Sequence, residues 1–423
     1  MTDSVLIIEN DPSTRDLFSV LFQRAGFTVY TAPDGAEGVT LAAAHKPDVI
    51  ICDLLMERMD GFQVVQAIRA NPELARATII VVSAKSYRPD IVRAKELGAD
   101  DYLVKPIVLD ELLATVQRSR EARTPRQLAV TFWGTRGSIA TPGPTTTVYG
   151  GNTSCVEVRA GGDVLVFDAG TGIRELGLAL IEEFRGRPLT VHLFISHTHW
   201  DHIQGFPFFL PAYAAETTIH LYGPQGQGRP LERLLGGQMN PDYFPVALGD
   251  LAATIRVHEF TGSSFQIGDT VIAAMYLNHP GMTLGYRVTS AGRSLVYATD
   301  NEQYRFTLEH VGQRAEAGRQ FGQRLDEEFV GFVSHADLYI GEAQYTDDEY
   351  PQKIGWGHSP LSATVEVALR ADVRALALFH HDPMHSDEVV AAMEAEARRL
   401  VASRGATLHC FAAREKQTVH VRR

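Results

Sequence analysis

The segment 197–202 holds the densest group of side chains that could do chemistry. Three histidines and one aspartate fall within it, namely His197, His199, Asp201 and His202. Imidazole and carboxylate ligands together suit Zn²⁺, Mn²⁺ or iron, and the sequence alone does not choose among these metals. His197 and His199 can point into one site, while Asp201 and His202 can turn toward a second. The segment follows the buried-strand pattern VHLFIS, so we expect a strand-to-helix loop that presents a metal centre rather than an ordinary polar surface loop.

A second set of polar side chains follows strand-like runs in the first 105 residues. In chain order these residues are Glu9, Asn10, Asp11, Asp53, Ser83 and Lys105. The ends of parallel strands meet at one edge of a sheet, where acidic groups around a crevice would bind a hard divalent cation. Asp53 could then accept a phosphoryl group, with Lys105 and Ser83 holding its oxygens. Any one of these residues means little alone, but the ordered set indicates a phosphoryl site.

The strands and helices that must position these groups follow two different sequence patterns along the chain. Up to about residue 122, strand-like runs alternate with amphipathic stretches, which predicts a doubly wound α/β domain with a parallel sheet. From Leu128 onward, Gly- and Thr-rich turns alternate with short strands, which is typical of a sheet-rich α/β domain. We therefore expect one domain over residues 1–122, a short linker over 123–127 and a second domain over 128–423.

Composition narrows the functional classes. The 423 residues carry a net charge of −12, which disfavours a nonspecific nucleic-acid binder, and no helix-turn-helix pattern follows the first domain, so we expect no DNA partner. The three cysteines, Cys52, Cys155 and Cys410, cannot form a disulfide framework and indicate a reducing, cytoplasmic setting. No apolar run approaches the length of a membrane span, and the N-terminus lacks the features of a signal peptide, so we expect no membrane association.

The first domain resembles the receiver domain of bacterial two-component response regulators. The similarity rests on VLIIENDPSTRDLF, DVIICDLLMERMDGF, VVSAKS and GADDYLVKP. It implies that Asp53 is the phosphoacceptor, that Tyr102 is the switch aromatic, and that the domain binds Mg²⁺. It also implies a sensor histidine kinase or phosphotransfer protein as partner. Asn10 is neutral where the family has the carboxylate that usually binds Mg²⁺ directly, which should weaken the cation site. The alternative is a degenerate receiver used for docking or dimerisation.

The second domain resembles the metallo-β-lactamase superfamily, whose fold is an αβ/βα sandwich, over about residues 128–423. The resemblance implies two divalent metal ions. By the family pattern the first ion is bound by His197, His199 and His279. The second is bound by Asp201, His202 and His380, with Asp300 bridging the two. His380 is preferred over His381 because it comes first after the strand ALALF. Asp168, in VFDAGTG, matches the buried carboxylate that orients the ligands.

Within that superfamily the chain resembles the phosphodiesterase branch, which includes tRNA 3′-end-processing ribonucleases and cyclic-nucleotide phosphodiesterases. The similarity rests on GWGHS, DLYIGEAQYT and the opening WGTRGSIATPGP. It implies that His358 donates a proton or binds phosphate, with Glu342 and Asp201 completing the catalytic group. Ser359 and Pro360 are expected as N-cap and first residue of a helix.

We therefore predict a response regulator whose output domain is a dimetal phosphodiesterase for a cyclic nucleotide or small phosphodiester, gated at Asp53. A homodimer is expected from the two resemblances. Three alternatives remain: a hydrolase of lactones, thioesters or β-lactams, a tRNA-processing-like ribonuclease, and a non-catalytic signalling adaptor. The third ligand position holds Asp300 rather than the cysteine of antibiotic-hydrolysing enzymes.

Overall fold

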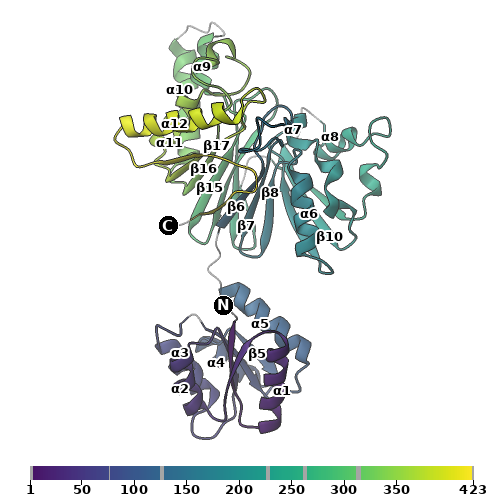
Figure 1. The fold of residues 1–423 in the computed structure, drawn as a ribbon, viewed down its shortest axis with the longest axis vertical. Helices are drawn as coiled ribbons and strands as arrows, with labels where there is room; N and C mark the ends of the chain where they lie inside the picture. Colours follow the sequence, from purple (N-terminus) through teal and green to yellow (C-terminus); the bar gives the residue numbers. More distant parts are fainter. Residues whose placement is uncertain are drawn as a thin grey trace. The chain divides into compact units, whose positions relative to one another are not determined.

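The computed structural model describes residues 3–75, 77–123, 128–224, 229–260, 264–310 and 316–421. The chain divides into two compact units, Met1–Pro125 and Arg126–Arg423, which are drawn in Figure 1. Helix α5 (Leu109–Arg123) includes the first residue of the predicted linker, while residues 124–127 lie outside the described residues. In the part of the chain that is described, no helix combines the length and the apolar character that a membrane crossing requires.

The N-terminal unit is a doubly wound α/β domain, as predicted. Its five strands are all parallel and lie in the order β2-β1-β3-β4-β5. They are β1 (Ser4–Ile8), β2 (Thr28–Ala32), β3 (Val49–Asp53), β4 (Thr78–Ser83) and β5 (Asp101–Val104). The helices before α5 are α1 (Pro12–Arg24), α2 (Gly35–His45), α3 (Gly61–Ala70) and α4 (Arg88–Glu96). Separate hydrophobic cores cover the two faces of this sheet, which explains the continuous apolar runs of its central strands.

The C-terminal unit is the predicted αβ/βα sandwich of two seven-stranded sheets. One sheet has the order β11-β10-β9-β8-β7-β6-β19. Its strands are β6 (Leu128–Gly134), β7 (Cys155–Ala160), β8 (Asp163–Phe167), β9 (Leu189–Phe194), β10 (Thr217–Pro224), β11 (Thr254–Phe260) and β19 (Thr418–Val421). The other sheet runs from β12 to β18 in chain order. Its strands are β12 (Ser264–Ile267), β13 (Thr270–Tyr276), β14 (Leu284–Ser290), β15 (Arg293–Ala298), β16 (Leu338–Glu342), β17 (Ala375–Phe379) and β18 (His409–Ala412).

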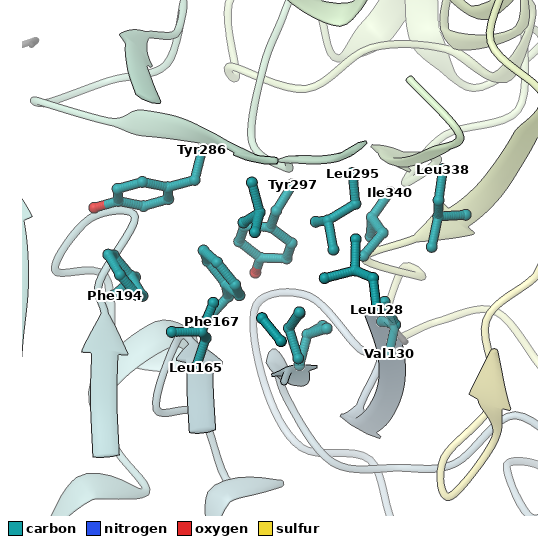
Figure 2. Close-up of a cluster of buried hydrophobic side chains, with 14 of the residues drawn as sticks. Leu128, Val130, Leu165, Phe167, Phe194, Tyr286, Leu295, Tyr297, Leu338 and Ile340 are labelled. Carbon is teal, nitrogen blue, oxygen red and sulfur yellow. The ribbon is translucent and has the colours of Figure 1, made fainter. Parts of the chain in front are cut away.

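A continuous apolar core joins the inner faces of the two sheets. Figure 2 shows Leu338 and Ile340 of one sheet close to Leu128 and Val130 of the other, all of them buried. Alternate residues of each strand enter this core, as a face-to-face sandwich requires. The sheets therefore form a rigid base for the loops at their ends.

Helices lie on the outer faces of the sandwich and in the loops that connect its strands. They are α6 (Ile173–Glu183), α7 (Trp200–Ile203), α8 (Leu231–Gln238), α9 (Tyr304–His310), α10 (Glu316–Val333), α11 (Leu361–Arg370) and α12 (Asp387–Ser403). Figure 1 shows α11 and α12 alongside β15–β17, where their apolar faces form a second core. The predicted start of α11 was wrong by one position. Pro360 is its N-cap, and Ser359 instead donates a hydrogen bond from Oγ to the carbonyl of Asn301, at 2.7 Å.

Candidate functional site

The histidines and carboxylates predicted as ligands come together at the ends of the parallel strands. Asp168, Asp300 and His380 come just after β8, β15 and β17, and each has a left-handed backbone, with φ of 62°, 54° and 60°. Such a conformation is uncommon for residues other than glycine and turns each chain sharply as it leaves the sheet. The strand β9 leads directly into the loop that carries His197 and His199. The sandwich thus brings segments distant in sequence to one end.

Four overlapping groups of potential ligands occur among the described residues; two of them include His358, and the other two correspond to the predicted metal sites. The first contains His197, His199 and His279, and one nitrogen from each lies within 4.8 Å of the others. The second consists of four buried residues that meet the same distance criterion: Asp201, His202, Asp300 and His380. The sequence analysis assigned these side chains to the same two groups, with Asp300 between them, and the structure brings them together. His381, the alternative to His380, lies outside both groups and its Nε2 faces the carbonyl of Ala413 at 3.1 Å.

The carboxylate of Asp300 reaches both groups. Its Oδ2 lies 3.3 Å from Nε2 of His202 and 3.4 Å from Nε2 of His380. Its Oδ1 lies 3.8 Å from Nε2 of both His197 and His279. A bridging position between two metal ions, which the family resemblance implied, is therefore open to this carboxylate.

The chemistry of these donors fits a pair of divalent ions. The Nε2 atom of His197 is buried, and no protein group forms a hydrogen bond with it among the described residues. Buried polar atoms normally have partners, so this nitrogen indicates a ligand. Burial holds the pKa values of His197, His199 and His279 below their usual value, which keeps the imidazoles neutral and able to bind metal.

Hydrogen bonds behind the ligands fix their orientation. Asp168 faces Nδ1 of His202 at 2.8 Å and accepts a bond from the Tyr297 hydroxyl at 2.6 Å. The Nδ1 of His380 faces Oε1 of Gln344 at 3.0 Å, and Nδ1 of His279 faces the carbonyl of Gly357 at 2.9 Å. These partners direct each Nε2 toward the centre of the site. The sequence analysis identified Asp168 but missed Tyr297 and Gln344. The only sequence signal for these two residues is that each lies near the end of a strand.

His358 and Glu342 form a buried pair beside the second group. Nδ1 of His358 lies 2.6 Å from Oε1 of Glu342 and 3.9 Å from Oδ1 of Asp300. Burial, reinforced by the charge of Asp300, raises the pKa of Glu342 well above its usual value. Burial also lowers the pKa of His358. The pair can therefore hold one proton between a carboxyl group and an imidazole, next to the predicted metal centre.

Glu302 positions the loop that carries His358, and the sequence analysis missed it. Its buried carboxylate accepts hydrogen bonds from the Tyr350 hydroxyl at 2.7 Å and from the N–H groups of Gly355 and Gly357, each at 2.8 Å. Both glycines have φ of +88°, which a residue with a side chain rarely adopts. The GWG sequence was a cue to this tight loop, but nothing in the sequence paired it with Glu302.

The Gly- and Thr-rich opening segment also reaches the site. The N–H of Ser138 donates to Oδ2 of Asp201 at 2.7 Å, and a Cβ at Gly137 would collide with the ring of His380. The guanidinium of Arg136 is fully buried and donates to the carbonyls of Gly150, Asp382 and His385. The segment after β6 is thus held directly against the predicted ligands.

A pocket of about 170 Å³ adjoins the first ligand group. Its walls are formed by the 197–199 segment and by Pro224, Arg229, Leu234 and the 280–282 turn. The pocket is largely apolar and carries one cation, so it could receive the uncharged part of a small anionic substrate.

In the N-terminal unit, the polar side chains at the strand ends form a smaller site. Nζ of Lys105 lies 2.8 Å from Oε2 of Glu9 and 3.3 Å from Oδ2 of Asp53. Burial raises the pKa of Glu9, although the nearby Lys105 opposes this shift. Asp11 accepts hydrogen bonds from the N–H and hydroxyl of Thr14 and so caps α1, while Asn10 is exposed.

Ser83 and Tyr102 lie on the two strands beside this site. Ser83 is fully buried at the end of β4, and the Tyr102 hydroxyl donates to the carbonyl of Lys85 at 2.9 Å. The two carboxylates, Glu9 and Asp53, suit a hard cation such as Mg²⁺, but the exposed amide of Asn10 adds no charge to the site.

Family models match both units of the chain. A model of the response regulator receiver domain matches residues 5–117, and one of the beta-lactamase superfamily domain matches residues 164–381, just over half of the chain. The chain belongs to the beta-lactamase superfamily. Its N-terminal unit is a response regulator receiver domain. A receiver domain implies a Mg²⁺ ion, and the metallo-β-lactamase fold of the C-terminal unit implies divalent metal ions.

Relatives of this beta-lactamase-superfamily protein match its receiver domain. It is 38% identical over 122 residues to the DNA-binding dual master transcriptional regulator RpaA of Synechocystis sp., which covers 29% of this chain and 50% of RpaA. It is 33% identical over 112 residues to PilH of Pseudomonas aeruginosa, covering 26% of this chain and 93% of PilH. The chain thus spans about half the length of RpaA.

Solved structures match the larger unit. The metallo-beta-lactamase fold protein YhfI of Bacillus subtilis covers 70% of this chain and 99% of its own, with a TM-score of 0.47 and 16% identity. Human tRNase Z, short form, covers 70% of this chain and 100% of its own, with a TM-score of 0.46 and 21% identity.

Proposed function

We propose that this protein is a response regulator whose output is a dimetal phosphodiesterase for a cyclic nucleotide or another small phosphodiester. The observation that carries the proposal is the buried His358–Glu342 pair, which lies within 4 Å of Asp300 at the junction of the two ligand groups. A proton donor at this position suits an alkoxide leaving group, which must be protonated as the P–O bond breaks. A lactone or β-lactam also releases a leaving group that takes up a proton, so the choice of substrate has to be made by assay.

Metal ions bound by the two ligand groups would neutralise charge on the phosphoryl oxygens and lower the pKa of a coordinated water. His358 would give its Nε2 proton to the leaving oxygen while the protonated carboxyl group of Glu342, which orients the imidazole, passes its proton to Nδ1, so that the imidazole stays neutral. Asp201, held by the Ser138 N–H, would accept a hydrogen bond from the attacking water and orient it. The adjoining pocket, with Arg229 on its wall, would hold the base or aryl group of the substrate.

Hydrolysis of a bis-aryl phosphodiester by the Zn²⁺- or Mn²⁺-loaded protein tests this function. His197→Ala should lose both metal and turnover, whereas His358→Ala should keep two metals per chain and lose most turnover. His335→Ala is the matched control, because that histidine is exposed and pairs with Asp372, which is not among the predicted site residues. Turnover that survives His358→Ala unchanged would remove the proton-donor role. Turnover of lactones or thioesters but not of diesters would favour another ester class, and bound metal with no turnover would favour the adaptor.

Regulation through the receiver is the second part of the proposal. The cluster of Lys105, Glu9 and Asp53 supports phosphoryl transfer to Asp53 from a sensor histidine kinase or phosphotransfer protein. An acyl phosphate such as acetyl phosphate should change the hydrolysis rate of the wild type, and Asp53→Ala should abolish that change without altering the basal rate. A rate that acetyl phosphate leaves unchanged would contradict the gating.

A further inference from the structure

The core between the two sheets opens to the surface at one edge of the C-terminal unit. The strands β18 and β19 follow each other in the chain, but each is the edge strand of a different sheet. Because the two strands separate instead of pairing, a cavity of about 570 Å³ lies between them. None of the predicted metal ligands lines this cavity, so it is distinct from the candidate active site.

The inner wall of the cavity is apolar. It is formed by Leu338, Ala375, Phe411, Val419 and Val421, which belong to the intersheet core or pack against it. Leu338 is labelled at the margin of the cluster in Figure 2. A ligand with an apolar body would therefore extend the core of the sandwich and remove this surface from water.

The rim of the cavity is positively charged, although the whole chain has a net charge of −12. Arginines from three segments and two histidines line it: Arg374, Arg398, Arg414, His409 and His420. The side chains of Arg374 and Arg398 are 58% and 57% exposed.

The two acidic residues of the lining accept backbone N–H groups and also pair with two of these arginines. Asp337 accepts from the N–H of Ser294 and lies 3.5 Å from Nε of Arg374. Glu394 accepts from the N–H of Ala412 and pairs with Arg398. The two carboxylate side chains are only 11% and 10% exposed, so the arginines present more of their charge to solvent. Three guanidinium groups thus face two carboxylates, and the excess positive charge suits an anion.

The edge of β18 is closed to another strand. Arg398 donates from Nε to the carbonyl of Cys410 at 3.0 Å, and the Ala412 N–H is bonded to Glu394 at 3.0 Å. These side chains from α12 occupy backbone groups that a peptide would need in order to add to the sheet. The occupant is thus better matched by a small molecule than by an extended peptide.

We propose that this cavity is a binding site for a small amphipathic anion, a carboxylate attached to an acyl chain of medium length. The acyl chain would lie against the apolar wall and the carboxylate would contact Arg374 and Arg398. The cavity volume is within the range of about 300–1,000 Å³ that is usual for small-molecule sites. The proposal does not rest on the phosphodiesterase function.

Calorimetric titration of the full-length protein with decanoate tests the site. We expect one decanoate per chain, and much weaker binding of decyltrimethylammonium, which has the same chain length and the opposite charge. Arg374→Ala and Arg398→Ala should each weaken decanoate binding by about tenfold, because each removes a charge-assisted contact. Arg399→Ala is the matched control, since Arg399 lies on the same helix, is 71% exposed and pairs with Glu396 outside the cavity.

A second variant tests the apolar wall. Val419→Trp should fill the cavity and abolish decanoate binding, and the exposed Arg374→Ala keeps the test decisive if the tryptophan variant does not fold. Equal binding of decanoate and decyltrimethylammonium would overturn the proposal. So would binding that both arginine variants leave intact, or binding that disappears in His197→Ala, which would move the ligand to the metal site.

Discussion

Replacing Glu302 by glutamine should loosen the loop that carries His358 while leaving the metal ligands in place. The carboxylate is buried and accepts hydrogen bonds from Tyr350, Gly355 and Gly357. Glutamine has nearly the same shape, so it creates no cavity. It does replace one acceptor oxygen by an NH₂ group, which cannot accept a hydrogen bond.

The size of the effect follows from these bonds. One buried donor loses its partner, which costs about 1–3 kcal/mol, and the remaining bonds change from charged to neutral acceptors, at about 1 kcal/mol each. The loop should therefore lose about 3–5 kcal/mol of local stability relative to its open states. If His358 is held at the reacting phosphoryl group only in the closed loop, turnover should fall by about 10- to 100-fold, which corresponds to roughly 1.4–2.7 kcal/mol.

Two measurements check this prediction. Hydrogen–deuterium exchange of the peptide 350–360 should become faster in Glu302→Gln, and hydrolysis of the bis-aryl phosphodiester should slow while the metal content stays at two per chain. Glu327→Gln is the control, because that carboxylate is 62% exposed and pairs with Arg370. Unchanged exchange of the loop in Glu302→Gln would refute the reasoning, whatever the turnover shows.

Three further predictions concern other parts of the molecule. Asp168→Asn should weaken metal binding by about 10- to 100-fold in a chelator competition, because it disturbs the acceptor for His202 Nδ1; full affinity would contradict this role. Asn10→Asp should raise Mg²⁺ affinity and speed labelling of Asp53 by acetyl phosphate, since it adds a carboxylate. Equal rates of labelling would show that Asn10 does not limit phosphorylation. Burial lowers the pKa of His192 from 6.5 to about 4. The unfolded chain thus takes up a proton that the folded one refuses, and stability falls from about pH 6.5 to 4. In thermal unfolding, His192→Gln should reduce this loss of stability at low pH by about 1–2 kcal/mol, after allowance for partial exposure of the side chain. The same loss of stability in the wild type and the variant would contradict the prediction.

The division of the chain and its two folds could be predicted because they are written in local patterns. The apolar runs of β3 and β4 are buried on both faces of a sheet, so they lack the alternation of a half-exposed strand. The strand β6 shows strict alternation, since one face meets the intersheet core and the other does not. Such periodicities arise from neighbouring residues and need no knowledge of distant contacts.

The first residue of helix α11 was harder to predict from the sequence. Ser359 was expected as the N-cap of α11 because serine followed by proline is common at that point. In the structure the hydroxyl is used elsewhere, by the carbonyl of Asn301, which lies 58 positions earlier in the chain. A distant acceptor thus outweighed a local preference, which a short sequence window cannot reveal.

The sequence by itself determined the chemical types at the site. Histidines and aspartates gathered in 197–202, and at the ends of later strands, predicted a donor set that suits metal ions. Asp53 and Lys105 likewise predicted a phosphoryl site at the ends of β3 and β5.

Only the tertiary structure decided how these groups are held and what surrounds them. The partners of Glu302, Tyr297 and Gln344 lie far from them in sequence, and no local pattern marks which strand ends will face each other. The cavity between β18 and β19 likewise exists only because consecutive strands join different sheets. The types of the donors are properties of single residues, whereas their distances, burial and proton affinities arise from the packing of the two sheets.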